Sequence, residues 1–202
     1  MTEKEWAESV KEYLSSIKLS NSIKIDTLIN IPYTNEIVEY RINFETISLS
    51  NKEMEFETDI LIYEQNADVI KPRIIIETKL KHVTTHDAIV YSYKAQNHKT
   101  ITPFIRYGII IGDRGHHPLP GRLFRHGMNF DFMMSFKKEE IDKDEKKILK
   151  ELIEKELYYS NQIEEMIYNS RSKNRKHYFI LQKELHLIEI SKKEGTSKHE
   201  PV

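Results

Sequence analysis

Two neighbouring apolar stretches of the chain contain charged residues of the kind that could hold a metal ion. Asp59 interrupts the stretch ETDILIY, and Glu77 and Lys79 lie at the end of IIIETKLK. Residues two apart in a strand project to the same face, so Glu77 and Lys79 share a face, and antiparallel pairing would place Asp59 opposite them. Buried charges need partners or a metal ion to offset their desolvation. We therefore predict that these residues form one site.

Metal-assisted hydrolysis of a phosphodiester is the chemistry that fits this set. Asp59, Glu77 and the carbonyl oxygen of Thr78 would supply the hard oxygen ligands that Mg²⁺ prefers, with Mn²⁺ as a substitute. Lys79 would position or activate the attacking water and offset phosphate charge. The alternative is an ordinary cross-strand ion pair on a solvated face. The run Ile74–Ile76 weighs against it, because such a run indicates a strand buried on both faces.

Hydrophobic periodicity predicts the elements that must position this site. Helices are expected over residues 3–18 and from Thr85 or His86 to Lys99. Strands are expected over 40–49, 56–63, 73–80, 104–111 and 129–136, with a turn at 51–52. A polar connection over 65–72 and a Gly- and Pro-rich loop over 114–127 complete the pattern. Within 56–63, Phe56 should share a face with Ile60, and Asp59 should face the other way. This order predicts an α/β fold with a central mixed β-sheet flanked by helices.

Asp59 followed by Glu77-Thr78-Lys79, on successive strands between two helices, resembles the PD-(D/E)XK nuclease superfamily. The resemblance covers about residues 1–112, and it departs from the pattern where Thr58 replaces the name-giving proline. It implies a restriction-endonuclease-like core, dependence on Mg²⁺ and cleavage of double-stranded DNA by a metal-dependent endodeoxyribonuclease. A type II restriction enzyme is the reading we favour. Acting on a symmetric site takes two active sites, which by analogy implies a homodimer.

Members of this superfamily often add a carboxylate from the first helix, and the sequence leaves that ligand open. Glu8 and Glu12 lie away from the apolar stripe of the helix and Glu3 borders it, while Glu57 shares the face of Asp59. The QxxxY pattern of RecB-like members is missing, although Tyr93 and Gln96 occupy the comparable helix.

Charge is concentrated in the middle of a chain whose net charge is only −1. Residues 71–127 contain 10 lysines and arginines against 3 acidic residues, whereas residues 1–70 contain 6 against 14. A basic block beside metal-binding carboxylates is typical of a polyanion-binding protein, although a solvated surface gives the same pattern. The candidate DNA contacts are Lys81, Lys94, Gln96, Arg114, His116, His117, Arg122 and Arg125. A His-Asn-His metal finger using His116, His117 and Asn129 is a weaker alternative.

Past Lys137 the pattern changes to a helical stripe that includes Ile148, Leu152 and Ile167. We divide the chain into a nuclease core over 1–136, a C-terminal helical extension over 137–190 and a disordered tail over 191–202. The stripe would serve as a dimer helix or as a cap on the chain's own core.

Several classes of protein are disfavoured by composition. The chain has no cysteine, hence no disulfide framework, and no apolar run long enough to cross a membrane. It has no secretory signal and no Gly-rich phosphate loop, so we expect a cytoplasmic protein without a nucleotide cofactor. Two rivals to a restriction enzyme remain. One is a structure-specific or repair nuclease of the same superfamily, and the other is a noncatalytic DNA-binding module whose carboxylates only make ion pairs.

Overall fold

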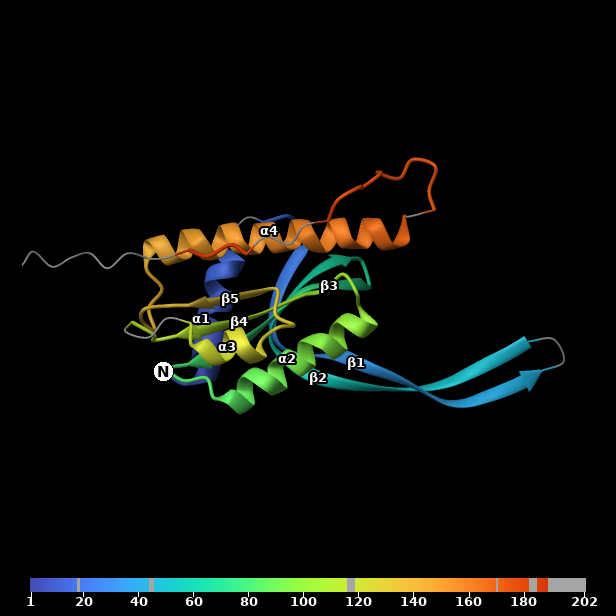
Figure 1. Cartoon of the computed structure of the whole chain (residues 1–202), viewed down its shortest axis with the longest axis horizontal. Coiled ribbons are helices and arrows are strands. Elements are labelled where there is room, and N and C mark those ends of the chain that lie inside the picture. Colours follow the sequence, from blue (N-terminus) through green and yellow to red (C-terminus); the bar gives the residue numbers. More distant parts are fainter. Residues whose placement is uncertain (18, 44–45, 116–118, 170, 182–184, 189–202) are drawn as a thin grey trace, which may run out of the picture.

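A five-stranded mixed sheet forms the centre of the chain, as a computed structural model shows (Figure 1). The structure describes residues 1–17, 19–43, 46–115, 119–169, 171–181 and 185–188. The strands are β1 (Ile23–Asn43), β2 (Thr46–Asn66), β3 (Val69–Leu80), β4 (Arg106–Gly112) and β5 (Phe132–Ser135), adjacent in that order. The first three pair antiparallel and the last three parallel. The predicted α/β class with a mixed sheet is confirmed.

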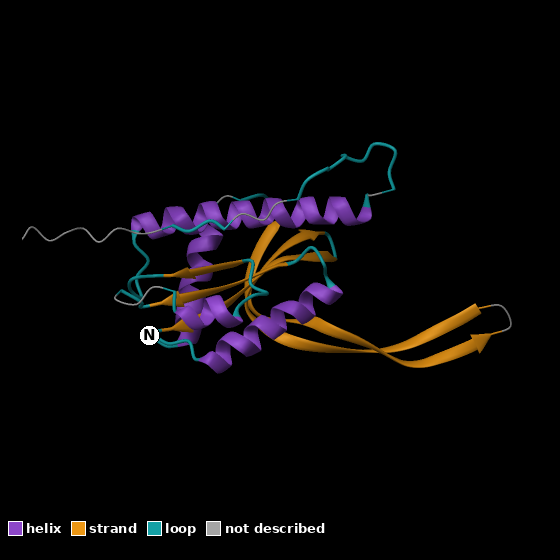
Figure 2. Cartoon of the chain, viewed as in Figure 1, coloured by secondary structure: helices purple, strands orange, loops and turns teal. Residues whose placement is uncertain are grey.

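Helices cover both faces of the sheet, because parallel strands must be joined by crossovers that leave the sheet plane (Figure 2). On one face, α1 (Glu3–Ser16) and α4 (Lys143–Tyr168) bury a cluster that includes Trp6, Ile60 and Ile76. On the other, α2 (Thr85–Ile101) and α3 (Gly121–His126) bury a cluster that includes Leu61, Ile75 and Ile109. None of the described helices is long and apolar enough to cross a membrane.

The α4 helix packs on the sheet rather than presenting its apolar stripe to solvent. Leu149, Ile153 and Leu157 are buried in the same cluster as Trp6. The helix begins at a capping box, in which the Asp142 side chain accepts hydrogen bonds from the backbone of the first turn. This arrangement is that of a cap on the chain's own core, and it leaves most of the stripe unavailable as a dimer surface.

The β2–β3 hairpin is tighter than the polar connection expected over 65–72. Asn66 pairs with Val69, so only two residues form the turn, and Ala67 adopts a left-handed φ of 51°. The polar residues around this turn belong to strand ends that lie in solvent, where polarity does not indicate a loop. Antiparallel pairing of the two strands, on which the site prediction depended, is confirmed.

Beyond the sheet, β1 and β2 continue as a two-stranded arm, and here two predictions are wrong (Figure 1). The strand expected over 40–49 is the end of β1, the connection and the start of β2, since Tyr40 pairs with Leu49 and Ile42 with Ile47. The turn expected at Asn51 and Lys52 lies inside β2.

The expected alternation of faces in β2 holds only from Ile60 onward. Ile60 packs in the α1 and α4 cluster, but the ring of Phe56 lies 4.8 Å from Nζ of Lys94, on α2. On the paired strand Leu28 has a left-handed φ of 57°, and Ile25 and Ile29 on either side of it pack in opposite clusters. The paired strands β1 and β2 therefore twist at the level of Asp59, so that residues before and after this point face opposite sides of the sheet.

Other differences are smaller. The loop expected over 114–127 contains α3, and the last predicted strand shortens to β5. His116 and His117 lie outside the described residues, as does the tail over 191–202.

Candidate active site

Asp59 lies where β2 separates from β3. The two strands pair only from Ile60, opposite Ile76, toward the hairpin turn. Past that point, Oδ2 of Asp59 accepts hydrogen bonds from the Thr78 backbone amide at 2.7 Å and from the Thr78 hydroxyl at 3.0 Å. The Asp59 carboxylate thus accepts the hydrogen bond that a backbone carbonyl of β2 would accept if the two strands were still paired at Thr78. It is thereby fixed beside the segment Glu77-Thr78-Lys79, as the sequence predicted.

Glu77 is the buried member of the site, with 2% of its surface exposed. Its Oε1 accepts a hydrogen bond from the hydroxyl of Tyr107 on β4 and lies 3.7 Å from Nζ of Lys94 on α2. Burial is the main cause that raises the pKa of Glu77 to about 7; Lys94 opposes it, and the Asp59 carboxylate adds to it. A carboxyl group that titrates near neutrality beside a second carboxylate is a place where a cation would bind favourably.

Lys79 projects toward the N-termini of α1 and α2. Its Nζ lies 3.2 Å from Oε2 of Glu3, 4.0 Å from Oδ1 of Asp87 and 5.2 Å from the ring centroid of Tyr91. Burial lowers the pKa of Lys79, but Tyr91 and Glu3 more than compensate, and the pKa lies above its usual value. Lys79 is therefore a fixed cation at neutral pH, suited to stabilising negative charge and unsuited to removing a proton.

Glu3 is the first-helix carboxylate that reaches the site. Glu8 instead contacts Lys11 at 2.8 Å and the hydroxyl of Thr27 at 3.0 Å, and Glu12 is exposed. Glu57 is exposed on β2, opposite Asn30. Of the four candidates left open by the sequence, the geometry favours Glu3, although in this structure its partner is Lys79.

The site contains three residues that sequence reasoning missed, namely Asp87, Tyr91 and Tyr107. Asp87, Tyr91 and Lys94 follow one another on the inner face of α2, and Tyr107 lies on β4. Spacings of four and three residues along a helix indicate a shared face, so this stripe was available from the sequence. Tyr107 could also have been predicted, because a tyrosine in a buried strand usually needs a hydrogen-bond partner. Lys94, which was predicted as a DNA contact, lies against Glu77.

The remaining predicted DNA contacts divide into two groups. Lys81, Arg114 and Arg122 gather around the segment that follows β3, where Nη1 of Arg114 donates to the Lys81 carbonyl at 2.6 Å and Nη1 of Arg122 to the Val83 carbonyl at 3.0 Å. Burial and the neighbouring Arg122 lower the pKa of Arg114. This basic cluster follows the end of β3 that carries Glu77 and Lys79.

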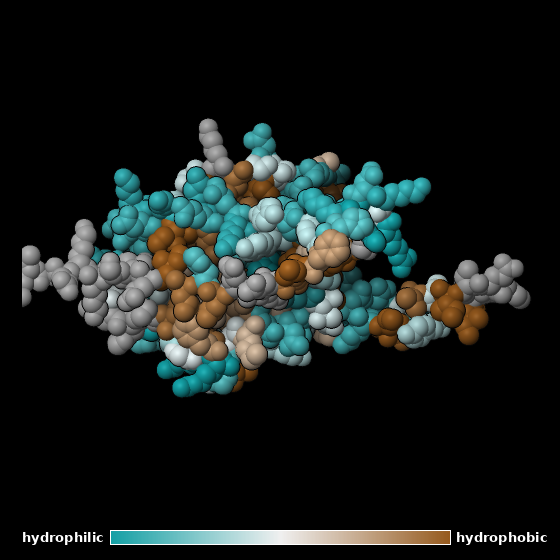
Figure 3. All heavy atoms as spheres, turned by 45° about the horizontal axis from the view of Figure 1, so that its top comes forward, coloured by the Kyte–Doolittle hydropathy of each residue, from teal (hydrophilic) through white to brown (hydrophobic). Residues whose placement is uncertain are grey.

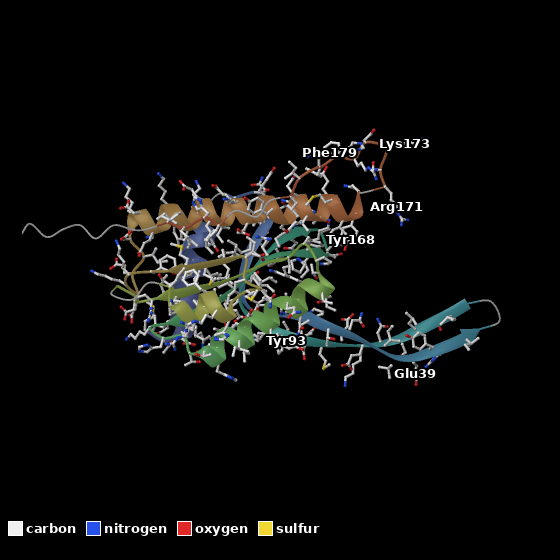
Figure 4. All side chains as sticks on the ribbon, in the orientation of Figure 1. Glu39, Tyr93, Tyr168, Arg171, Lys173 and Phe179 are labelled. Carbon is white, nitrogen blue, oxygen red and sulfur yellow. The ribbon has the colours of Figure 1, made fainter. Side chains whose placement is uncertain are left out.

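The second group lies away from the carboxylates. Gln96 and Arg125 line a shallow groove between α2 and α3, together with Tyr93, whose side chain points away from the sheet in Figure 4. Asn129 also lies there, and its amide donates to the Ser92 hydroxyl at 3.2 Å. Asn129 therefore has a structural role, which leaves the His-Asn-His alternative without support among the described residues.

The residues present fit a magnesium ion better than a transition metal. Two carboxylates and the Thr78 carbonyl are hard oxygen donors, and Mg²⁺ in proteins commonly uses one or two carboxylates and keeps several waters. Among the residues that the structure describes, no cluster of three His, Cys, Asp or Glu side chains could hold a metal by itself. A partly hydrated ion shared with a substrate phosphate is consistent with such a site.

Comparison with known proteins finds no matching family model and no matching curated protein.

Proposed function

We propose that the chain is a Mg²⁺-dependent DNA endonuclease, with a type II restriction enzyme as the form we favour. The observation that carries the proposal is the meeting of Asp59, buried Glu77 and cationic Lys79 where β2 and β3 separate. Two carboxylates and a cation together match what phosphodiester hydrolysis needs, namely a metal ligand set and stabilisation of developing phosphate charge.

Each residue would contribute through its fixed position. Mg²⁺ held by Asp59, Glu77 and the Thr78 carbonyl would supply Lewis acidity and a water of lowered pKa. The backbone amide and hydroxyl of Thr78 orient Asp59, and Tyr107 orients Glu77. Lys79, held by Glu3 and Tyr91, would face the scissile phosphate and stabilise the charge that builds on its oxygens.

Double-stranded DNA as substrate rests on the superfamily resemblance and on the position of the basic cluster. Lys81, Arg114 and Arg122 follow the strand end that carries the site, where cationic side chains could hold the phosphates flanking a scissile bond. A homodimer in the cytoplasm, requiring no nucleotide cofactor, belongs to the same proposal.

A noncatalytic DNA-binding module is the second candidate, and one observation favours it. The charges of the site are already paired within the chain, Lys79 with Glu3 at 3.2 Å and Lys94 with Glu77 at 3.7 Å. Under this reading the carboxylates serve only to balance lysines.

Cleavage assays with the whole chain separate the two. Supercoiled plasmid and long linear DNA would be incubated with the protein in Mg²⁺ or in EDTA. The proposal expects cutting in Mg²⁺ only, with Lys79→Ala slower by at least about 100-fold and still folded. Lys147→Ala is the matched control, because that lysine is exposed on α4, on the opposite face of the sheet.

The products identify the kind of nuclease. Discrete fragments would support a restriction enzyme, and cutting confined to branched DNA would support a repair nuclease. DNA binding without cutting under any of these conditions would leave the binding module. Wild-type rates in Lys79→Ala would refute the role assigned to that lysine.

A further inference from the structure

The arm formed by β1 and β2 leaves the body of the molecule and has no second layer of its own (Figure 1). Its root is held by α2. Nδ1 of His98 lies 3.0 Å from the Pro32 carbonyl oxygen, and the rings of Tyr33 and Phe56 stack at 3.8 Å beside His98. Beyond this root, β1 and β2 pair only with each other among the described strands.

The outer part of the arm is amphipathic. Tyr40 pairs with Leu49 and Ile42 with Ile47, and directly opposed residues two positions apart project to one face. These four residues are 66%, 54%, 84% and 65% exposed, in the same order. Hydrophobic atoms are visible on the arm in Figure 3. A two-stranded ribbon is marginally stable in water by itself, so an apolar face of this kind indicates a surface that becomes covered.

The opposite face of the arm is polar and its charges are balanced. Glu39 pairs with Ser50 and Arg41 with Ser48, and Nη2 of Arg41 lies 3.4 Å from Oε2 of Glu39. In Figure 4 Glu39 lies on the arm well away from the body of the molecule. Toward the root, Glu36 pairs with Lys52. The arm therefore lacks the excess of lysine and arginine that binds nucleic acid phosphates. None of the four residues of its apolar face is charged.

We propose that this face binds the same face of a second copy of the chain. Two identical ribbons related by a two-fold axis would place apolar residues on apolar residues and leave Glu39 and Arg41 in solvent, which is the self-complementarity an isologous contact requires. The four side chains expose on the order of 500 Å², so two copies together would bury about 1,000 Å², the lower bound for a specific interface. Ile37 and Val38, exposed beside the bulge in β1, extend the same region.

The oligomeric state in solution tests this surface. Sedimentation equilibrium and light scattering of the whole chain should show a dimer at micromolar concentrations. Ile42→Glu places a charge within the apolar contact and should weaken dimerisation by about 30-fold or more. Ser48→Glu introduces the same charge on the polar face and should leave the dimer intact. The Ile42→Glu monomer should remain folded, because Ile42 contributes to no core cluster.

A cross-linking measurement is independent of the stability of these variants. The natural chain has no cysteine, so Leu49→Cys would carry the only thiol, on the apolar face. Mild oxidation should give a covalent dimer from Leu49→Cys and little from Ser50→Cys, on the polar face. A monomeric wild-type chain would overturn the proposal, as would equal effects of the two glutamate variants. Binding of the monomer to neutral phosphatidylcholine vesicles, lost in Ile42→Glu, would reassign the surface to lipid and also overturn it.

Discussion

Glu77→Gln is the substitution that tests the core of the site without assuming catalysis. The folded chain holds this carboxyl group at a pKa of about 7 because it is buried beside Asp59, whereas its reference value is 4.5. Below pH 4.5 the group is protonated in both states. Between the two values the unfolded chain releases the proton and the folded chain retains it, so the stability that this group contributes is lost as pH rises through 7.

The magnitude follows from the difference between the two pKa values. Each unit of pKa corresponds to about 1.4 kcal/mol, so the loss amounts to about 3 kcal/mol once the pH exceeds 7. Glutamine has nearly the same shape, accepts the hydrogen bond from Tyr107 and carries no charge. The free energy of unfolding of Glu77→Gln minus that of the wild type should therefore rise by about 3 kcal/mol between pH 4.5 and 8.

Urea unfolding in EDTA, followed by fluorescence of Trp6 at several pH values, measures this difference. Glu57→Gln is the matched control, because it makes the same substitution at a carboxylate that is exposed on β2. Adding Mg²⁺ at pH 8 should stabilise the wild type by mass action and leave Glu77→Gln unchanged. Parallel curves for the wild type and Glu77→Gln would refute the reasoning, since the two carboxylates could not then lie together in a buried site.

Two further substitutions test the surroundings of the site. Ile153→Ala removes a side chain that α4 buries against α1 and the sheet, and it should lower the free energy of unfolding by about 3 kcal/mol in urea titrations. A loss below about 1 kcal/mol would mean that α4 is not part of the core. Lys81→Ala should weaken DNA binding at every sequence and reduce the salt dependence of the binding constant by about one counterion, as titrations at several salt concentrations would show. An unchanged salt slope would place Lys81 outside the interface.

The parts of the fold that the sequence predicts well are those whose pattern has one physical meaning. The run Ile74–Ile76 is buried on both faces because α1 and α4 cover one side and α2 the other. The helix start expected at Thr85 or His86 is set by the capping side chain of Thr84. Asp59 and Glu77 come together because the antiparallel hairpin is short enough to fix their register.

The arm could not be predicted in the same way. Alternation of Tyr40, Ile42, Ile47 and Leu49 indicates a strand with one apolar face, but it gives no information on what covers that face. Because the arm lies in solvent, polar residues such as Asn51 and Lys52 occur within its strands and do not mark turns. A periodicity argument assumes that apolar faces point into the chain's own core, and this assumption fails for an element that leaves the core.

The role of Lys79 shows what three-dimensional contacts add to a motif. From the sequence, an acid-x-lysine triplet is compatible with a lysine that removes a proton from water and with one that only stabilises charge. Glu3 and Tyr91 come from two helices, and both raise the pKa of Lys79 against the effect of burial. A lysine held in this way keeps its proton, so in the proposed nuclease the acid–base chemistry would come from a metal-bound water or from Glu77, whose pKa of about 7 is close to neutral pH. The same two carboxylates that make the site costly to fold are thus the groups through which a divalent ion would stabilise it.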